Sequence, residues 1–136
     1  MKTIAKVLLV DDSDATIFFN KIVLSKTGYV DDILIAKNGL EALQIIQSGI
    51  VPEIIFLDIN MPVMDGWEFL SKFQDLENSL KNTTIILMIG AELTKEDKEL
   101  ARSIDQIKEF SGKMLSRVGV DAIRQKYFNK ELTSIE

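Results

Sequence analysis

The sequence predicts an α/β fold, in which a parallel sheet carries helices on both of its faces. Strand-like and helix-like segments alternate along the 136 residues and are joined by short connections, which is the pattern of repeated βα units. Two strand-like runs, at residues 8–10 and 54–57, are entirely apolar, as strands buried on both faces are. Each of these runs ends in aspartate, so we expect acidic side chains at the carboxyl edge of the sheet, where open α/β sheets bind ligands.

Length and composition indicate a single domain over residues 1–136. The chain is 46% apolar, enough for a core of its own, and its net charge of −5 argues against nonspecific binding to nucleic acid or to an anionic membrane. It has no histidine and no cysteine, which excludes disulfides, catalytic triads built on these residues and a phosphohistidine relay within the chain. Because the sequence has no apolar run near the ~18 residues of a membrane span and no signal peptide, we expect a cytoplasmic protein.

The first half of the chain is predicted to hold two strand–helix pairs. The strands are expected at 6–10 and 33–36, and the helices at 14–27 and 39–48. Glycines just beyond the helices, Gly28 and Gly49, are typical stop signals. The apolar residues expected along these helices are Ile17, Phe18, Ile22, Leu24, Leu40, Leu43, Ile45 and Ile46.

The second half is predicted to add three more pairs, which brings the core of the domain to about residues 6–128. The strands are expected at 53–57, 83–89 and 107–111, and the helices at 66–75, 94–104 and 118–129, followed by a frayed polar tail at 130–136. Thr94, with Asp97 three residues later, indicates the N-cap of the fourth helix.

Three aspartates are candidate metal ligands. Asp11 and Asp12 follow the first strand, and Asp58 follows the third. If these two strands are neighbours, the three carboxylates share one crevice and repel each other unless a cation lies among them. Hard oxygen ligands of this kind suit Mg²⁺ or a similar divalent ion.

The loop that follows Asp58 favours a compact turn back into a helix. It contains Pro62 and Gly66, both typical of turns, and the backbone carbonyl near Asn60 would supply a further metal ligand. Taken alone, this segment fits equally well an ordinary βα loop in which Asp58 is merely solvated.

Together these motifs resemble the receiver domain of two-component response regulators. The resemblance rests on Asp11-Asp12 after an apolar strand and on Asp58 within the segment Leu-Asp-Ile-Asn-Met-Pro-Val-Met-Asp-Gly, with βα alternation between the two. It extends from about residue 6 to residue 128. It implies a flavodoxin-like, doubly wound sheet of five parallel strands in the order 2-1-3-4-5, which is the order of the chemotaxis member of that family.

The resemblance implies a role for each acidic residue. Asp58 would be the phosphoacceptor. Asp12 and Asp58 would bind Mg²⁺ directly, together with the main-chain carbonyl of Asn60, and Asp11 would act on the metal mainly through water. An aspartate carboxylate is a weak nucleophile, but an adjacent divalent ion neutralises the phosphoryl oxygens and orients the attack.

Two further positions match the receiver pattern near the fifth strand. Lys113 matches the lysine whose ammonium would pair with Asp58 at rest and with the phosphoryl group afterwards. Phe110 falls at the aromatic position that swings inward in receivers on phosphorylation, although a plain core phenylalanine fits the sequence equally well.

Two other positions depart from the receiver pattern. Receivers carry Thr or Ser at the end of the fourth strand, where the hydroxyl binds a phosphoryl oxygen, but this chain has Gly90 there and offers only a backbone N–H. Receivers also carry a proline after the lysine, joined by a cis peptide bond. Here Met114 follows Lys113, and a non-proline cis bond costs about 2.5–4 kcal/mol, so we expect a trans bond and a displaced Lys113.

The expected function is that of a stand-alone receiver without enzymatic activity beyond phosphorylation and dephosphorylation of its own Asp58. A sensor histidine kinase or a histidine phosphotransfer protein would donate the phosphoryl group, and an unidentified protein would bind the fourth helix, the fifth strand and the last helix. The chief alternative is a pseudo-receiver scaffold with a weakened or absent switch, which Gly90 and Met114 favour. An aspartyl-phosphate hydrolase needs a second aspartate where this chain has Asn60, and a dinucleotide-binding fold needs a glycine fingerprint that is missing.

Overall fold

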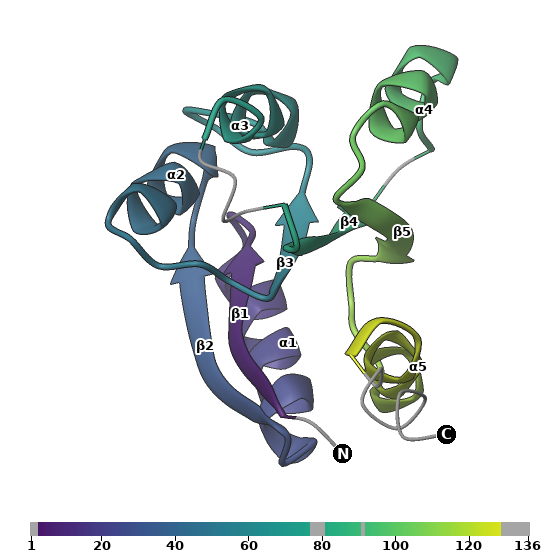
Figure 1. Ribbon diagram of the computed structural model, residues 1–136. Helices are drawn as coiled ribbons and strands as arrows, with labels where there is room; N and C mark the ends of the chain where they lie inside the picture. The colour runs from purple at the N-terminus through teal and green to yellow at the C-terminus, as the bar shows by residue number, and fades with distance from the viewer. Residues whose placement is uncertain (1–2, 77–80, 91, 129–136) are drawn as a thin grey trace, which may run out of the picture.

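A sheet of five parallel strands forms the centre of the molecule. The computed structural model describes residues 3–76, 81–90 and 92–128, and its strands follow the order β2-β1-β3-β4-β5, which confirms the expected order. The strands are β1 (Ile4–Val10), β2 (Val30–Ala36), β3 (Ile54–Asp58), β4 (Thr84–Ile89) and β5 (Ile107–Gly112). β1 and β3, the two strands that lead into the aspartates, are direct neighbours in the sheet (Figure 1).

Helices cover both faces of this sheet (Figure 1). They are α1 (Asp14–Lys26), α2 (Gly39–Gln47), α3 (Gly66–Phe73), α4 (Lys95–Arg102) and α5 (Arg117–Phe128). α2, α3 and α4 lie on one face, and α1 and α5 lie on the other. The arrangement is the doubly wound, flavodoxin-like architecture that the sequence predicted.

The sheet divides the hydrophobic core into two layers. Phe69 and Phe73 of α3 lie in the layer under α2–α4, and Val120 and Ile123 of α5 lie in the layer under α1 and α5. Every residue of β3 is buried, and each buried aliphatic side chain contributes about 1.5–3 kcal/mol to folding. The strand that ends at Asp58 is therefore held from both faces.

β2 is longer than the sequence predicted. It begins at Val30 instead of residue 33, because Val30 pairs with Ile4 and the ladder continues along β1. Asp31 and Asp32 are exposed on this edge strand, where charged side chains are tolerated and protect the edge against further pairing. A prediction based on apolar runs missed these three residues because two of them are acidic.

The apolar stripes of the first two helices differ in part from the prediction. Phe18, Ile22 and Leu40 are exposed, so their expected place on the core side is wrong. α1 buries Ile17 and Leu24, as predicted, and also Asn20, which lies on the same face of the helix. The face was misassigned because a polar residue stands in the middle of it.

Side-chain caps begin α1, α2, α3 and α4 at the carboxyl edge of the sheet. The N–H of Asp97 donates to Thr94 Oγ1 at 3.1 Å, which confirms the predicted cap, and the N–H of Glu68 donates to Asp65 Oδ1 at 2.9 Å. Among the described residues, no helix combines the length and apolar character needed to cross a bilayer. The predicted helix end at Asn129 and the tail at 130–136 fall outside the described residues.

Candidate functional site

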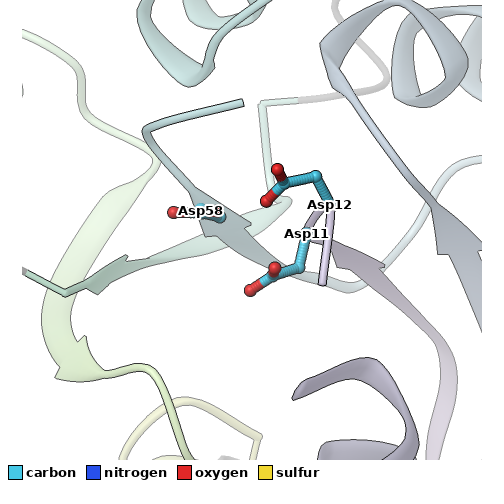
Figure 2. Close-up of side chains that lie close together, drawn as sticks. All are labelled: Asp11, Asp12 and Asp58. Atoms are coloured by element: carbon cyan, nitrogen blue, oxygen red, sulfur yellow. The ribbon is translucent and has the colours of Figure 1, made fainter. Parts of the chain in front are cut away.

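Asp11, Asp12 and Asp58 meet at the carboxyl edge of the sheet. Val10 of β1 lies opposite Leu57 of β3 in the ladder, so the residues that follow them emerge side by side. One carboxylate oxygen from each aspartate lies within 4.8 Å of the other two, and Figure 2 shows these side chains at the ends of the two strands. The structure therefore brings together the three acidic residues that the sequence singled out.

Asp58 is fixed by the backbone around it. Its side chain is 1% exposed, and the N–H of Asn60 donates to its Oδ1 at 3.3 Å. The N–H of Gly66 donates to the carbonyl of Ile59 at 2.8 Å, and a Cβ at position 66 would lie 2.8 Å from the carbonyl oxygen of Asp58. Only glycine allows α3 to begin this close to the end of β3, so Gly66 closes the loop behind the acceptor carboxylate.

The second oxygen of Asp58 identifies this site as suited to a cation. Asp58 Oδ2 is buried and accepts no well-directed hydrogen bond from any described residue, although Lys113 Nζ lies 2.9 Å away as an ion pair. A buried carboxylate oxygen of this kind is costly unless a charge or a metal compensates it. With three carboxylates and one ammonium, the donor set fits a divalent ion with hard oxygen ligands.

Asp11 is buried beside Asp58 and has partners on both oxygens. Ser13 N–H donates to its Oδ1 at 2.8 Å, and Lys113 Nζ lies 3.6 Å from its Oδ2. Burial raises the pKa of Asp11, and the negative charge of Asp58 adds to this increase, against the opposing effects of the Ser13 N–H and the Lys113 ammonium. Asp12 is exposed at the mouth of the site.

Lys113 reaches the acidic cluster despite the departures around it. The bond between Lys113 and Met114 is trans, as expected, since the described residues contain no cis peptide, but the ammonium still contacts Asp58. Burial lowers the pKa of Lys113, yet its contact with Asp58 and the charges of Asp11, Asp58 and Asp12 outweigh this effect, so its pKa stays above the usual value of 10.5. The trans peptide bond therefore does not prevent Lys113 from forming the predicted ion pair with Asp58.

Gly90 lies beside the stem of Lys113. Ile89 pairs with Gly112 in the β4–β5 ladder, so the next residues of both strands are neighbours. A Cβ at position 90 would lie 3.3 Å from Cε of Lys113 and 3.5 Å from its Cγ. The φ of Gly90 is outside the left-handed region, so other residues fit its backbone conformation. The missing side chain leaves room that the lysine stem uses.

Phe110 points away from the core. It lies on β5 opposite Leu87 and is 47% exposed, so the alternative of a plain core phenylalanine is wrong. The aromatic ring would have to move to reach the site, and its role in switching stays a prediction.

Asn20 is the residue near the site that the sequence did not reveal. It is 4% exposed, its Nδ2 donates to the carbonyl of Lys113 at 3.0 Å, and its Oδ1 accepts from the N–H of Leu115 at 2.8 Å. A signal was present, because Asn20 falls on the same helical face as Leu24 and Ile17. The predicted buried face of α1 was based on apolar residues alone and therefore did not include Asn20.

Comparison with known proteins gives the same family from sequence and from structure. The sequence model described as "Response regulator receiver domain" matches residues 7–109. The chain is 30% identical over 105 residues to sporulation initiation phosphotransferase F of Bacillus subtilis, a match that covers 77% of this chain and 82% of that protein. Its fold matches the crystal structure of a two-component response regulator from Cytophaga hutchinsonii with a TM-score of 0.83 and 28% identity, over 94% of this chain and 99% of that one.

Several relatives are much longer than this chain. The sensor histidine kinase CheAY of Helicobacter pylori is 33% identical over 119 residues, which cover 82% of this chain but 14% of the kinase. The chain spans 27% or less of the length of three such relatives. The similarity to these proteins therefore concerns one part of each of them.

Proposed function

Because the chain belongs to the response regulator receiver family of two-component signalling, we propose that it accepts a phosphoryl group onto Asp58 from a phosphohistidine of a partner protein. The observation that carries this proposal is the arrangement around Asp58. Its carboxylate is buried at the end of β3, shares a crevice with Asp11 and Asp12, and lies 2.9 Å from the ammonium of Lys113. Receivers pair with histidine kinases, and the chain itself has no histidine to serve as donor.

The proposed transfer exchanges one bond to phosphorus for another. A carboxylate oxygen of Asp58 attacks the phosphorus of the phosphohistidine, a P–O bond forms and the P–N bond breaks. The imidazole leaves with the electron pair of that bond and takes up a proton. Lys113, freed from the neutralised carboxylate, then faces the phosphoryl oxygens as a positive point charge.

Asp11, Asp12 and Asp58, with the main-chain carbonyl of Asn60, would hold Mg²⁺ at this site. The ion would supply positive charge against the phosphoryl oxygens and so reduce their repulsion of the attacking carboxylate. Asp58 is buried and hydrogen-bonded by Asn60, so this chain keeps its acceptor in one orientation before the donor arrives.

A phosphorylation-dependent change of binding partners is the proposed output. The receiver family supports this proposal, and the identity of the downstream protein is open to experiment. Gly90 favours the alternative of a scaffold that keeps the fold but switches weakly. The complete set of Asp11, Asp12, Asp58 and Lys113 supports phosphoryl acceptance instead, because a scaffold would have no use for three clustered carboxylates with a lysine ammonium against the buried one.

The first test is the intact mass of the protein after incubation with a small phosphoramidate and Mg²⁺. The phosphoramidate carries the same P–N bond as phosphohistidine. We expect the wild-type chain to gain one phosphoryl group and to gain none in the presence of a metal chelator. Asp58→Asn, which keeps the size of the side chain, should stay unlabelled under both conditions, and labelling of this variant at the wild-type rate would overturn the assignment.

A further inference from the structure

We infer that Asn20 is a positioning residue, which holds the backbone on both sides of Met114 so that Lys113 lies across Gly90 and against Asp58. This inference rests on the proposed function, because it concerns how the lysine is presented to the acceptor. Asn20 itself lies on α1, and its side chain forms hydrogen bonds with the backbone of Lys113 and Leu115.

The hydrogen bonds of Asn20 are the first observation behind this inference. Its amide donates to the carbonyl of Lys113 at 3.0 Å and accepts from the N–H of Leu115 at 2.8 Å. A single buried side chain thus satisfies the peptide groups that flank Met114, whose own side chain is 51% exposed and anchors nothing in the core. The carbonyl of Lys113 and the N–H of Leu115 lie between β5 and α5, outside any regular strand or helix. Loss of the Asn20 amide would therefore remove a hydrogen bond from each of these two peptide groups.

The path of the Lys113 side chain is the second observation. Its stem lies over Gly90, where a Cβ would be 3.3 Å from Cε, and its ammonium ends 2.9 Å from Asp58 and 3.6 Å from Asp11. Gly90 leaves this path open but cannot hold the lysine in it, since it has no side chain. The position of the ammonium therefore depends on where the backbone of residue 113 is held, and Asn20 holds its carbonyl.

The location of Asn20 agrees with this role. It lies beneath the acidic cluster, where it lines a cavity of about 10 Å³ together with Asp11, Val10 and Met88. α1 begins at Asp14, two residues after Asp12, with Ser13 as its N-cap. The same helix thus connects the two strand-end aspartates to the lysine opposite them, through one amide.

Competition between the lysine and a metal ion supplies the test, with Mg²⁺ alone as the probe. An ammonium 2.9 Å from Asp58 and 3.6 Å from Asp11 weakens cation binding there, so Lys113→Met should bind Mg²⁺ about tenfold more tightly than wild type. If Asn20 holds the lysine in place, Asn20→Leu should also bind Mg²⁺ more tightly, by about threefold. In the Lys113→Met background, Asn20→Leu should change the affinity no further, because there is no ammonium left to position.

Controls separate positioning from loss of structure. Thr83→Val removes a buried hydrogen bond from Thr83 Oγ1 to the carbonyl of Pro52, at the opposite edge of the sheet. It should lower stability and leave Mg²⁺ affinity unchanged, since a weaker fold does not create a better metal site. If Asn20→Leu does not fold, Asn20→Ser removes the same bridge and leaves room for water to hydrate the freed peptide groups.

Two results would overturn the inference. One is an unchanged or weaker Mg²⁺ affinity in a folded Asn20 variant, and the other is an equal effect of that variant with and without Lys113. Failure of the proposed function would look different, because the wild-type chain would then gain no phosphoryl group from the phosphoramidate. The Mg²⁺ affinities would still decide the role of Asn20, since they do not depend on phosphorylation. If the proposed function and the positioning role of Asn20 are both correct, Asn20→Leu should also slow phosphorylation in the presence of Lys113 and have no such effect in Lys113→Met.

Discussion

At the scale of single residues, the site is governed by an excess of negative charge. Three carboxylates crowd one end of two strands, and the ammonium of Lys113 lies within ion-pair distance of Asp11 and Asp58. Burial of a carboxylate without such a partner costs several kcal/mol. The lysine therefore stabilises the resting site, and it also becomes available when the charge on Asp58 changes.

The exposures of Asp11 and Asp12 predict unequal contributions to metal binding. Asp11 is buried with its oxygens engaged by Ser13 and Lys113, whereas Asp12 is exposed and free to approach an ion from the mouth of the site. We expect Asp12→Asn to weaken Mg²⁺ binding by about tenfold or more and Asp11→Asn by less. The fluorescence of Trp67, which lines a cavity with Asn60 and Gly90, can follow the titration, and equal losses in the two variants would contradict this division of roles.

Gly90 provides a prediction about the missing hydroxyl. Gly90→Thr fits the backbone, since φ is not left-handed, and Cε of Lys113, 3.3 Å from the new Cβ, belongs to a flexible side chain that can move by a few tenths of an ångström. A hydrogen bond to a charged group is worth about 1.5–3 kcal/mol. We therefore expect Gly90→Thr to bind a beryllofluoride-type phosphoryl mimic at least about tenfold more tightly.

The matched control for this change is Gly90→Ala, which adds the Cβ without the hydroxyl. It should displace the lysine stem to the same extent and leave the affinity for the phosphoryl mimic at or below that of wild type. If both variants bind the mimic equally, the hydroxyl has no partner in the phosphoryl group, and the proposal that Gly90 weakens the switch is wrong.

At the scale of elements, β5 and α5 are joined by a polar cluster on Glu109. Lys126 Nζ and the hydroxyl of Tyr127 both donate to Glu109 Oε2, at 2.7 and 2.8 Å. The hydrogen bond from Lys126 lowers the pKa of Glu109 below its ordinary value of 4.5, with a smaller contribution from Tyr127 and against the opposing effect of burial. The same carboxylate raises the pKa of Tyr127 to about 12, together with burial, which is the larger cause.

This cluster predicts a pH-dependent contribution to stability. A carboxylate with a lowered pKa in the folded state stabilises the fold above its unfolded pKa, and the contribution is lost as pH falls through the folded value. Wild type should therefore exceed Glu109→Gln in free energy of unfolding by about 0.5–1 kcal/mol at pH 7. The difference should shrink below pH 4.5, as measured by urea unfolding, and a difference that stays constant down to acid pH would contradict this account.

At the scale of the whole molecule, much of the fold could be predicted because central strands carry an unambiguous signal. β3 and β4 are buried along almost their whole length, so their apolar runs marked their positions, and the strand ends placed the aspartates. Edge strands do not carry this signal. β2 contains exposed Asp31 and Asp32, and its start could be found only from its pairing with β1.

The acidic cluster and the pairing of Lys113 with Asp58 were predicted, but the contacts that hold the lysine backbone were not, for a physical reason. Asp11, Asp12 and Asp58 follow the ends of two strands that are neighbours in the sheet, as the resemblance to receivers implied. The position of Lys113 depends instead on contacts between segments far apart in the chain, from Asn20 and Gly90. A polar residue within an apolar helix gives no indication of its partner 93 residues later, so only the tertiary structure reveals it.

The most direct test of the central claim is chemical trapping of the phosphorylated residue. After incubation with the phosphoramidate and Mg²⁺, borohydride reduces an acyl phosphate at its carbonyl carbon, releases phosphate and leaves homoserine in place of aspartate. Peptide mass spectrometry then locates the homoserine. The account predicts homoserine at position 58 and unmodified aspartate at positions 11 and 12. Homoserine at another aspartate, or a phosphorylated chain in which Asp58 is unchanged, would contradict it.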